Sequence, residues 1–303
     1  MPAEPAPSVN PRQPEESVLV AAARAMRPRQ WAKNVLVAAA PFTAGRLLEP
    51  DVAVATVAAF VSFCLVSSTV YLINDARDVE EDRKHPTKRL RPIPLGTLPL
   101  RVAWILAAVL VVAGLGLALL THVVLAVILA VYLAVQVAYS AGLKHEPVLD
   151  LAVVASGFLL RAIAGGVASD IDLSQWFLLV ASFGSLFMVA GKRYSEMHSI
   201  GAAAGTRRSL ESYSVSYLRF VWTLAATVTI TAYTLWALEH DAAGNYSWAA
   251  WSIGPFVLGM LRYAVDIDRG GAGTPEDIVL GDRVLRLLGL LWLGLVGLSV
   301  LVA

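Results

Sequence analysis

A stretch of mixed charge, YLINDARDVEEDRKHPTKRLRPIP at residues 71–94, follows about twenty almost uncharged residues. If the preceding helix continues through the acidic half, Asn74, Asp78 and Asp82 lie four residues apart on one helix face, with Asp75 beside them. Clustered carboxylate and amide oxygens suit Mg²⁺, which fills its remaining coordination positions with waters and substrate phosphates. A solvated helix end with local salt bridges is the simpler alternative. Because the acids project from an apolar helix, where ionisable groups usually mark function, the Mg²⁺ site is favoured, with Asn74, Asp78 and Asp82 as ligands.

The basic half of the same stretch has the opposite charge. Lys88, Arg89 and Arg91 follow the acids closely enough to fold back over a metal-bound phosphate. Anchoring at lipid headgroups is the alternative for some of them. The stretch as a whole therefore predicts a binding site for a metal-bound diphosphate.

Three further motifs place polar residues near apolar segments, as candidates for substrate binding. They are RPRQWAKN with Lys33 and Asn34, YSAGLKHEPVLD with Tyr139, Lys144 and Asp150, and GKRYSEMH with Lys192, Arg193, Tyr194 and Glu196. Arg161 lies eleven residues after Asp150, on nearly the same helix face and about 16 Å deeper. An arginine at that depth either pairs inside the bundle or binds an anionic substrate, and the sequence leaves both readings open.

The elements that position these residues are predicted to be membrane spans. The chain of 303 residues is 57% hydrophobic and 16% charged, with a mean hydropathy of +0.65, whereas soluble domains are about 25% charged. A span needs roughly 20 apolar residues. Nine segments qualify: 30–47, 52–74, 99–120, 122–141, 149–168, 174–191, 214–238, 247–265 and 280–302. The predicted fold is an all-α, polytopic membrane bundle of nine transmembrane helices.

The distribution of Lys and Arg predicts the orientation of this bundle. Nearly all of them lie in the N-terminal tail and in the loops after the even-numbered spans, which places those loops and the N-terminus in the cytoplasm. Residues 1–23, rich in Pro and Glu, are expected to form a disordered tail, and 24–303 a single transmembrane catalytic domain in the plasma (inner) membrane. The net charge of +1 gives no reason to expect nucleic-acid binding. The sequence is compatible with a monomer or a homo-oligomer.

These motifs resemble the UbiA superfamily of intramembrane prenyltransferases. Its first aspartate-rich motif, N-D-x-x-D-x-x-x-D, stands here unbroken as Asn74, Asp75, Asp78 and Asp82, and RPIPLG and YSAGLK are also similar. The resemblance covers residues 27–300 and implies nine spans and Mg²⁺, while the distribution of Lys and Arg places the acidic motif, and with it the active site, on the cytoplasmic side. Most members carry a second aspartate-rich motif after span six, where this chain has GKRYSEMH. That departure favours a donor with a phosphate remote from its leaving diphosphate.

The resemblance is strongest to an actinobacterial branch of the superfamily. It implies transfer of 5-phosphoribose from phosphoribosyl diphosphate to a polyprenyl (decaprenyl) phosphate, a step toward cell-wall arabinan. In that reaction Asp75, Asp78 and Asp82 are expected to hold the Mg²⁺ that binds the diphosphate of the donor. Tyr194 and Glu196 are candidates for contacts to the ribose hydroxyls. Lys192, Arg193 and Lys33 are candidates for the remote phosphates. The alternatives are prenyl transfer to an aromatic or other acceptor, and a secondary transporter with an intramembrane ion path.

Overall fold

The computed structural model describes residues 17–200, 213–241, 248–271, 278 and 281–301, and within these ranges it is helical, with no strand. The elements are α1 Val18–Ala25, η1 Pro28–Ala38, α2 Ala39–Thr43, α3 Pro50–Arg77, α4 Val79–Lys84, η2 Lys88–Leu90, α5 Pro92–Leu95, α6 Leu100–Thr121, α7 Val123–Ala141, η3 Leu143–His145, α8 Leu149–Ala168, α9 Gln175–Ile200, α11 Val215–Asp241, α12 Trp248–Asp268 and α14 Arg283–Leu301. The η elements are 3₁₀ helices. The all-α prediction is confirmed.

Each of the nine predicted spans falls on helical structure. In the described part of the chain, seven helices are long and apolar enough to cross a membrane: α3, α6, α7, α8, α9, α11 and α14. The other two predicted spans correspond to α12 and to the pair η1–α2. The bundle is therefore that of a multi-pass membrane protein, while the count of nine spans and the cytoplasmic side of the N-terminus stay predictions.

The N-terminal part departs from the predicted regular span. Arg27 has φ 55° and ψ 62°, the left-handed conformation, and this turns the chain between α1 and η1. Pro28 then starts η1, whose 3₁₀ turns run to Ala38, and Pro41 sits in the first turn of α2, where no N–H is needed. The tail was predicted to be disordered to residue 23, which is wrong for residues 18–23, since α1 begins at Val18 with Ser17 as its N-cap. Residues 1–16 lie outside the described part.

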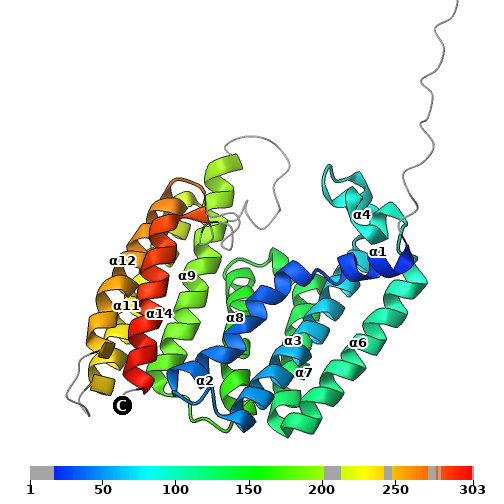
Figure 1. Cartoon of the computed structure of the whole chain (residues 1–303). Helices are drawn as coiled ribbons and strands as arrows, with labels where there is room; N and C mark the ends of the chain where they lie inside the picture. Colours follow the sequence, from blue (N-terminus) through cyan, green and yellow to red (C-terminus); the bar gives the residue numbers. More distant parts are fainter. Residues whose placement is uncertain (1–16, 201–212, 242–247, 272–277, 279–280, 302–303) are drawn as a thin grey trace, which may run out of the picture.

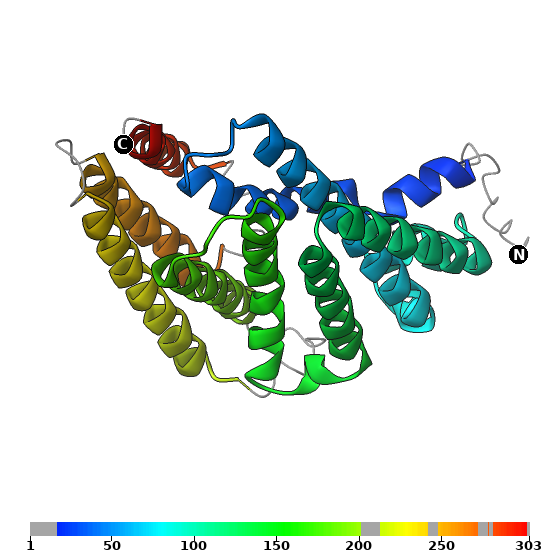
Figure 2. The ribbon, with the colours of Figure 1, turned by 90° about the horizontal axis from the view of Figure 1, so that it is seen from below.

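The helices form two groups joined by a central pair. Figure 1 shows α11, α12 and α14 on one side and α3, α6 and α7 on the other, and the view from below in Figure 2 places α8 and α9 between them. The short helices α1 and α4 lie at one end of the bundle, and the C-terminal end of α14 lies at the opposite end. Buried apolar residues form separate cores, one around α9 and α11 and another around α3, α7 and α8.

Glycine at position 165 lets η1 lie directly against α8. A Cβ atom built at Gly165 would lie 1.7 Å from the carbonyl oxygen of Val37, which is a backbone atom and cannot rotate away. This close approach brings Asn34 of η1 within hydrogen-bonding distance of Arg161 on α8. The packing of small residues therefore positions a polar network inside the bundle.

Replacing Gly165 with alanine is expected to destabilise the protein by about 1–3 kcal/mol, because the added methyl group overpacks a backbone contact. The measurement is the free energy of unfolding in detergent. Gly116→Ala on α6 is the matched control, because a Cβ there has no neighbouring atom within 4 Å. If both variants have the free energy of unfolding of the wild type, the contact between η1 and α8 has room for a methyl group, and the prediction is wrong.

Candidate functional site

The acidic motif lies where α3 ends and α4 begins. The helix breaks at Asp78, whose φ of −91° and ψ of 12° are not helical. The hydrogen bonds from the Asp78 N–H to the Asn74 carbonyl (3.0 Å) and from the Asp82 N–H to the Asp78 carbonyl (2.8 Å) nevertheless keep the four-residue spacing. The predicted continuous helix is thus replaced by a kinked one, and the three residues still follow one another along it.

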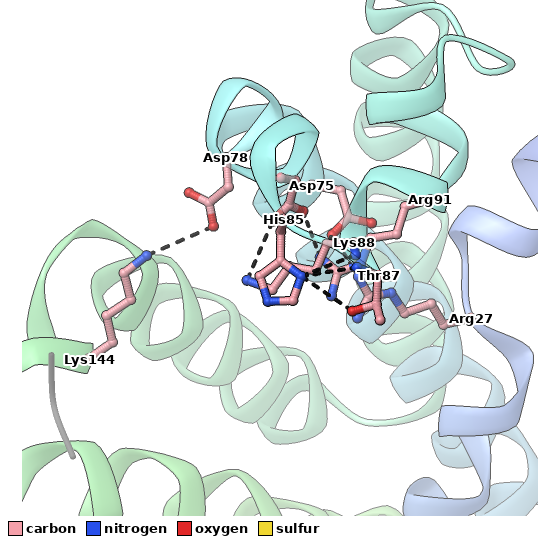
Figure 3. A network of polar contacts seen from close by, with 9 residues as sticks. Arg27, Asp75, Asp78, His85, Thr87, Lys88, Arg91 and Lys144 are labelled. Carbon is pink, nitrogen blue, oxygen red and sulfur yellow. Dashed lines mark hydrogen bonds and ion pairs between the residues drawn. The ribbon is translucent and has the colours of Figure 1, made fainter. Parts of the chain in front are cut away.

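The break separates the acidic side chains into two directions. Asp75 and Asp82 are buried, and both bind the same nitrogen of Arg91, Nη1, at 3.1 and 2.7 Å. Asp78 is more exposed and instead faces Lys144 of η3, with the Lys144 Nζ 3.8 Å from Asp78 Oδ2. Figure 3 shows Lys144 approaching Asp78 from the side opposite to Arg91. The structure therefore groups Asp75 with Asp82, where the sequence had grouped Asn74, Asp78 and Asp82.

The C-terminal turn of α7 connects this acidic region with a second polar cluster. The Ser140 hydroxyl donates to Asn74 Oδ1 at 2.5 Å. Its neighbour Tyr139 accepts a hydrogen bond from Arg193 Nη2 of α9 at 3.3 Å. Two consecutive residues thus connect two polar clusters, although Asn74 and Arg193 are more than a hundred residues apart in sequence.

The second cluster is built around a buried ion pair. Arg193 and Asp150 are 4% and 0% exposed, and Arg193 Nε lies 3.3 Å from Asp150 Oδ2. Arg193 also binds Glu196 at 3.0 Å. The Tyr213 hydroxyl donates to Asp150 Oδ1 at 2.5 Å and accepts from the N–H of Val148 at 2.6 Å. Burial, aided by the hydrogen bond to Asp150, raises the pKa of Tyr213 above its ordinary value.

The remaining predicted basic residues are half-buried or exposed. Lys192 lies 3.9 Å from Glu196 and is 39% exposed at its side chain. Lys88 lies 3.4 Å from Asp82 Oδ1, in a loop where His85 Nδ1 accepts the N–H groups of Thr87 and Lys88. Arg89 is exposed on η2, and Lys33 is half-buried on η1 beside Asn34.

Tyr194 does not face either cluster. Its side chain is fully buried against α11 and α12, and its hydroxyl donates to Asp268 Oδ1 at 3.0 Å and accepts from Arg219 at 2.5 Å. The ring stacks on His198. The expectation that Tyr194 contacts a ribose hydroxyl is therefore corrected, because its neighbour Arg193 points toward the site and a helix turns about 100° between consecutive residues. Glu196, one turn further, does lie with Arg193.

Arg161 is satisfied inside the bundle by neutral groups. Its guanidinium donates to Asn34 Oδ1 at 2.7 Å, to the carbonyl of Gly157 at 2.5 Å and to the Tyr132 hydroxyl at 3.1 Å. It also lies 5.3 Å from the centre of the Phe63 ring. These contacts agree with the first of the two readings, pairing within the bundle, and they hold η1 against α8.

The acidic side chains fit a divalent cation in chemistry. In the described part of the chain, no three His, Cys, Asp or Glu side chains converge as a ready metal-binding group. Asp75 and Asp82, however, are buried carboxylates with a positively charged nitrogen of Arg91 already held between them. All four residues of the motif, Asn74 included, offer hard oxygen atoms of the kind that Mg²⁺ prefers. The oxygen atoms of the motif can therefore hold a divalent cation. In the structure, the guanidinium of Arg91 lies between two of its carboxylates.

Sequence reasoning missed three residues of these clusters. Arg27, whose Nη2 lies 2.6 Å from Asp75 Oδ1, begins the quoted RPRQWAKN motif, in which only Lys33 and Asn34 were singled out. Ser140 stood inside the quoted YSAGLK motif, and its proximity to Asn74 could have been suspected there. Tyr213 gave no signal in the sequence, because only the fold brings it to Asp150, 63 residues earlier in the chain.

Comparisons with known proteins agree with this architecture. The model of the UbiA prenyltransferase family matches residues 35–275. A decaprenyl-phosphate phosphoribosyltransferase of Mycolicibacterium smegmatis is 54% identical over 259 residues, covering 82% of this chain and 81% of the relative. One from Corynebacterium glutamicum is 48% identical, covering 93% and 87%. A UbiA homolog from Archaeoglobus fulgidus bound to GPP and Mg²⁺ has the same fold, with a TM-score of 0.70 at 16% identity over 93% of this chain and 100% of that one.

Proposed function

The chain belongs to the UbiA prenyltransferase family, and from this premise we propose that it transfers 5-phosphoribose from phosphoribosyl diphosphate to a polyprenyl phosphate. The relatives at 48–54% identity carry a name that describes a phosphoribosyltransferase acting on decaprenyl phosphate, and they are covered over at least 80% of their length. Release of diphosphate completes the reaction. A prenyl phosphate as acceptor fits a multi-pass membrane protein, because the lipid tail can stay among the helices while its phosphate reaches the α4 end.

One observation carries the proposal: Tyr139 and Ser140, at the C-terminal end of α7, connect the acidic motif with the cluster around Arg193 and Lys192. A donor with two separate phosphate groups needs such a pair of sites. The acidic cluster would hold the diphosphate through a metal ion, and Lys192 would bind the 5-phosphate. Arg193, buried and paired with Asp150, would position the turn of α9 that carries Lys192 and Glu196.

We propose that Asn74, Asp78 and Asp82 hold Mg²⁺, with Asp75 assisting. This ligand set would require the Asp78 side chain to leave Lys144 and turn toward Asp82. When bound, the ion would stabilise the negative charge that gathers on the diphosphate as the bond to ribose C1 breaks. The protein's own basic groups, Lys88 and Lys144, lie next to these acids and would share that charge.

The polyprenyl phosphate is already an anion at neutral pH, so its oxygen can attack C1 without a strong general base. In-line attack would invert the configuration at C1. Glu196, which lies 3.0 Å from Arg193, is the remaining candidate for a ribose hydroxyl contact. Exclusion of water from C1 would fall to the surrounding helix ends, since water could otherwise replace the lipid as the nucleophile.

Purified protein supplied with labelled phosphoribosyl diphosphate, polyprenyl phosphate and Mg²⁺ is expected to give a labelled lipid. Addition of EDTA should abolish the product, and excess Mg²⁺ should restore it, because the carboxylates cannot bind the diphosphate unaided. The product is measured by extraction into organic solvent and chromatography.

Two results would contradict the proposal. If a prenyl diphosphate and an aromatic acceptor give product while phosphoribosyl diphosphate does not, the protein has the more general prenyltransferase activity of its family. If EDTA leaves the labelled lipid unchanged, the metal assignment is wrong even though the substrates are right.

A further inference from the structure

Two arginine side chains converge on one oxygen of Asp75. Arg27 Nη2 lies 2.6 Å and Arg91 Nη1 lies 3.1 Å from Asp75 Oδ1, and the Asp75 side chain is only 3% exposed. Figure 3 shows both side chains directed to this carboxylate, from α1–η1 on one side and from the start of α5 on the other. Two like charges on one oxygen repel each other, and Arg91 lies closer to Asp82 Oδ2, at 2.7 Å, than to the oxygen that it shares with Arg27.

Arg27 reaches Asp75 from a backbone conformation that is unfavourable for arginine. Its φ of 55° lies in the left-handed region, which costs a residue with a side chain about 1 kcal/mol or more. The guanidinium also lies 4.8 Å from the ring centre of Tyr71, on the same helix as Asp75. Strained residues of this kind gather at ligand sites, where the surrounding structure holds them in place.

The other carboxylates of the motif are also neutralised by the chain itself. Arg91 bridges Asp75 to Asp82, Lys88 lies 3.4 Å from the second oxygen of Asp82, and Lys144 faces Asp78. Among the described residues, at least four cationic side chains therefore surround three carboxylates. The site has a surplus of positive charge before any metal enters, which attracts an anion and opposes a lone cation.

We propose that Arg27 and Arg91 exchange partners during substrate binding: they neutralise Asp75 and Asp82 when these acids hold no metal, and they bind the donor's diphosphate when a divalent cation takes the acids. The proposal rests on the proposed function, because it requires a metal-bound diphosphate at this site. The planar guanidinium suits the exchange, since its forked donors match carboxylate and phosphate oxygens equally well.

Coupling between the metal and the diphosphate follows from this exchange. A metal ion arriving alone must displace two arginines that then have no anion to bind. A diphosphate arriving with it gives both arginines new partners. Each ligand therefore strengthens the binding of the other by the same factor, as linkage requires. Arg27 and Arg91 would act as binding residues for the diphosphate and also as the reason why metal alone binds weakly.

The test compares purified full-length Arg91→Gln and Arg27→Gln proteins with the wild type and with Arg101→Gln. Arg101 is an exposed arginine in the first turn of α6, so its replacement is the matched control. Mn²⁺ binding without diphosphate is measured from the loss of the free-ion electron paramagnetic resonance signal. We expect about tenfold tighter Mn²⁺ binding in Arg91→Gln, a smaller gain in Arg27→Gln, and wild-type binding in Arg101→Gln. Labelled inorganic diphosphate in the presence of Mg²⁺ should bind about tenfold more weakly to the first two.

Unchanged or weaker Mn²⁺ binding in folded Arg91→Gln and Arg27→Gln would overturn the exchange, and so would a wild type that binds Mn²⁺ as tightly without diphosphate as with it. If Arg91→Gln is recovered unfolded, the Mn²⁺ affinity of Arg27→Gln tests the exchange instead, because Arg27 lies on a different segment of the chain. The outcomes separate the two proposals. A wild type that transfers phosphoribose while the variants leave Mn²⁺ affinity unchanged disproves the exchange alone. Tighter Mn²⁺ binding in the variants without any transfer by the wild type disproves the function alone.

Discussion

Asp78→Asn is expected to lower the rate of phosphoribosyl transfer by about a thousandfold or more while the protein stays folded. Removal of one charged group that stabilises the transition state typically costs a factor of this size. Asp78 is the most informative of the three acids because its side chain is 39% exposed and its ion pair with Lys144 is long, at 3.8 Å. Asp75 and Asp82 are buried in ion pairs, so their replacement would disturb folding as well as activity. The measurement is the initial rate of labelled lipid formation at saturating Mg²⁺.

Asp51→Asn provides the control for this prediction. Asp51 is an exposed acid in the first turn of the same helix, α3, at the end opposite Asp78. The same change of charge there should leave the rate near that of the wild type. A folded Asp78→Asn enzyme with near-normal activity would remove Asp78 from the metal site.

Arg193→Ala is expected to lower the free energy of unfolding by about 3–5 kcal/mol. The substitution leaves the fully buried carboxylate of Asp150 without its positive partner, and an uncompensated buried charge costs an amount of this order. Tyr213 would still donate one hydrogen bond to Asp150, which is not enough to replace a charge. Transfer activity should fall as well, because Arg193 ties α9 to Tyr139 of α7. Unfolding by denaturant in detergent gives the stability directly.

Two further variants test whether the unpaired charge of Asp150 causes this loss of stability. Arg46→Ala, which breaks an exposed ion pair with Glu49 between α2 and α3, should leave the melting temperature unchanged. The double variant Asp150→Asn with Arg193→Met should recover much of the lost stability, since no unpaired charge remains. If Arg193→Ala is as stable as the wild type, the buried pair contributes nothing to folding, and its role is confined to the site.

The Tyr194 result shows where reasoning from the sequence fails. Arg193 and Tyr194 are consecutive, and both belong to a polar motif at the end of an apolar segment. Only the rotation of α9 about its axis sends Arg193 to Asp150 and Tyr194 to Asp268. That rotation is fixed by the packing of α9 against α8 on one side and α11 on the other, which the spacing of apolar residues on a nearly all-apolar helix cannot reveal.

The sequence by itself determined the helical segments, the family and the acidic motif. Hydropathy and residue spacing are local properties, so they predict where a helix forms and which neighbouring residues it presents together. The tertiary structure alone decided which charges meet. Arg27 and Asp75 are 48 residues apart, Asp150 and Arg193 are 43 apart, and Asn34 and Arg161 are 127 apart. An ion pair depends on the distance between two atoms, and for residues on different helices that distance is set by helix packing and not by any pattern within one segment.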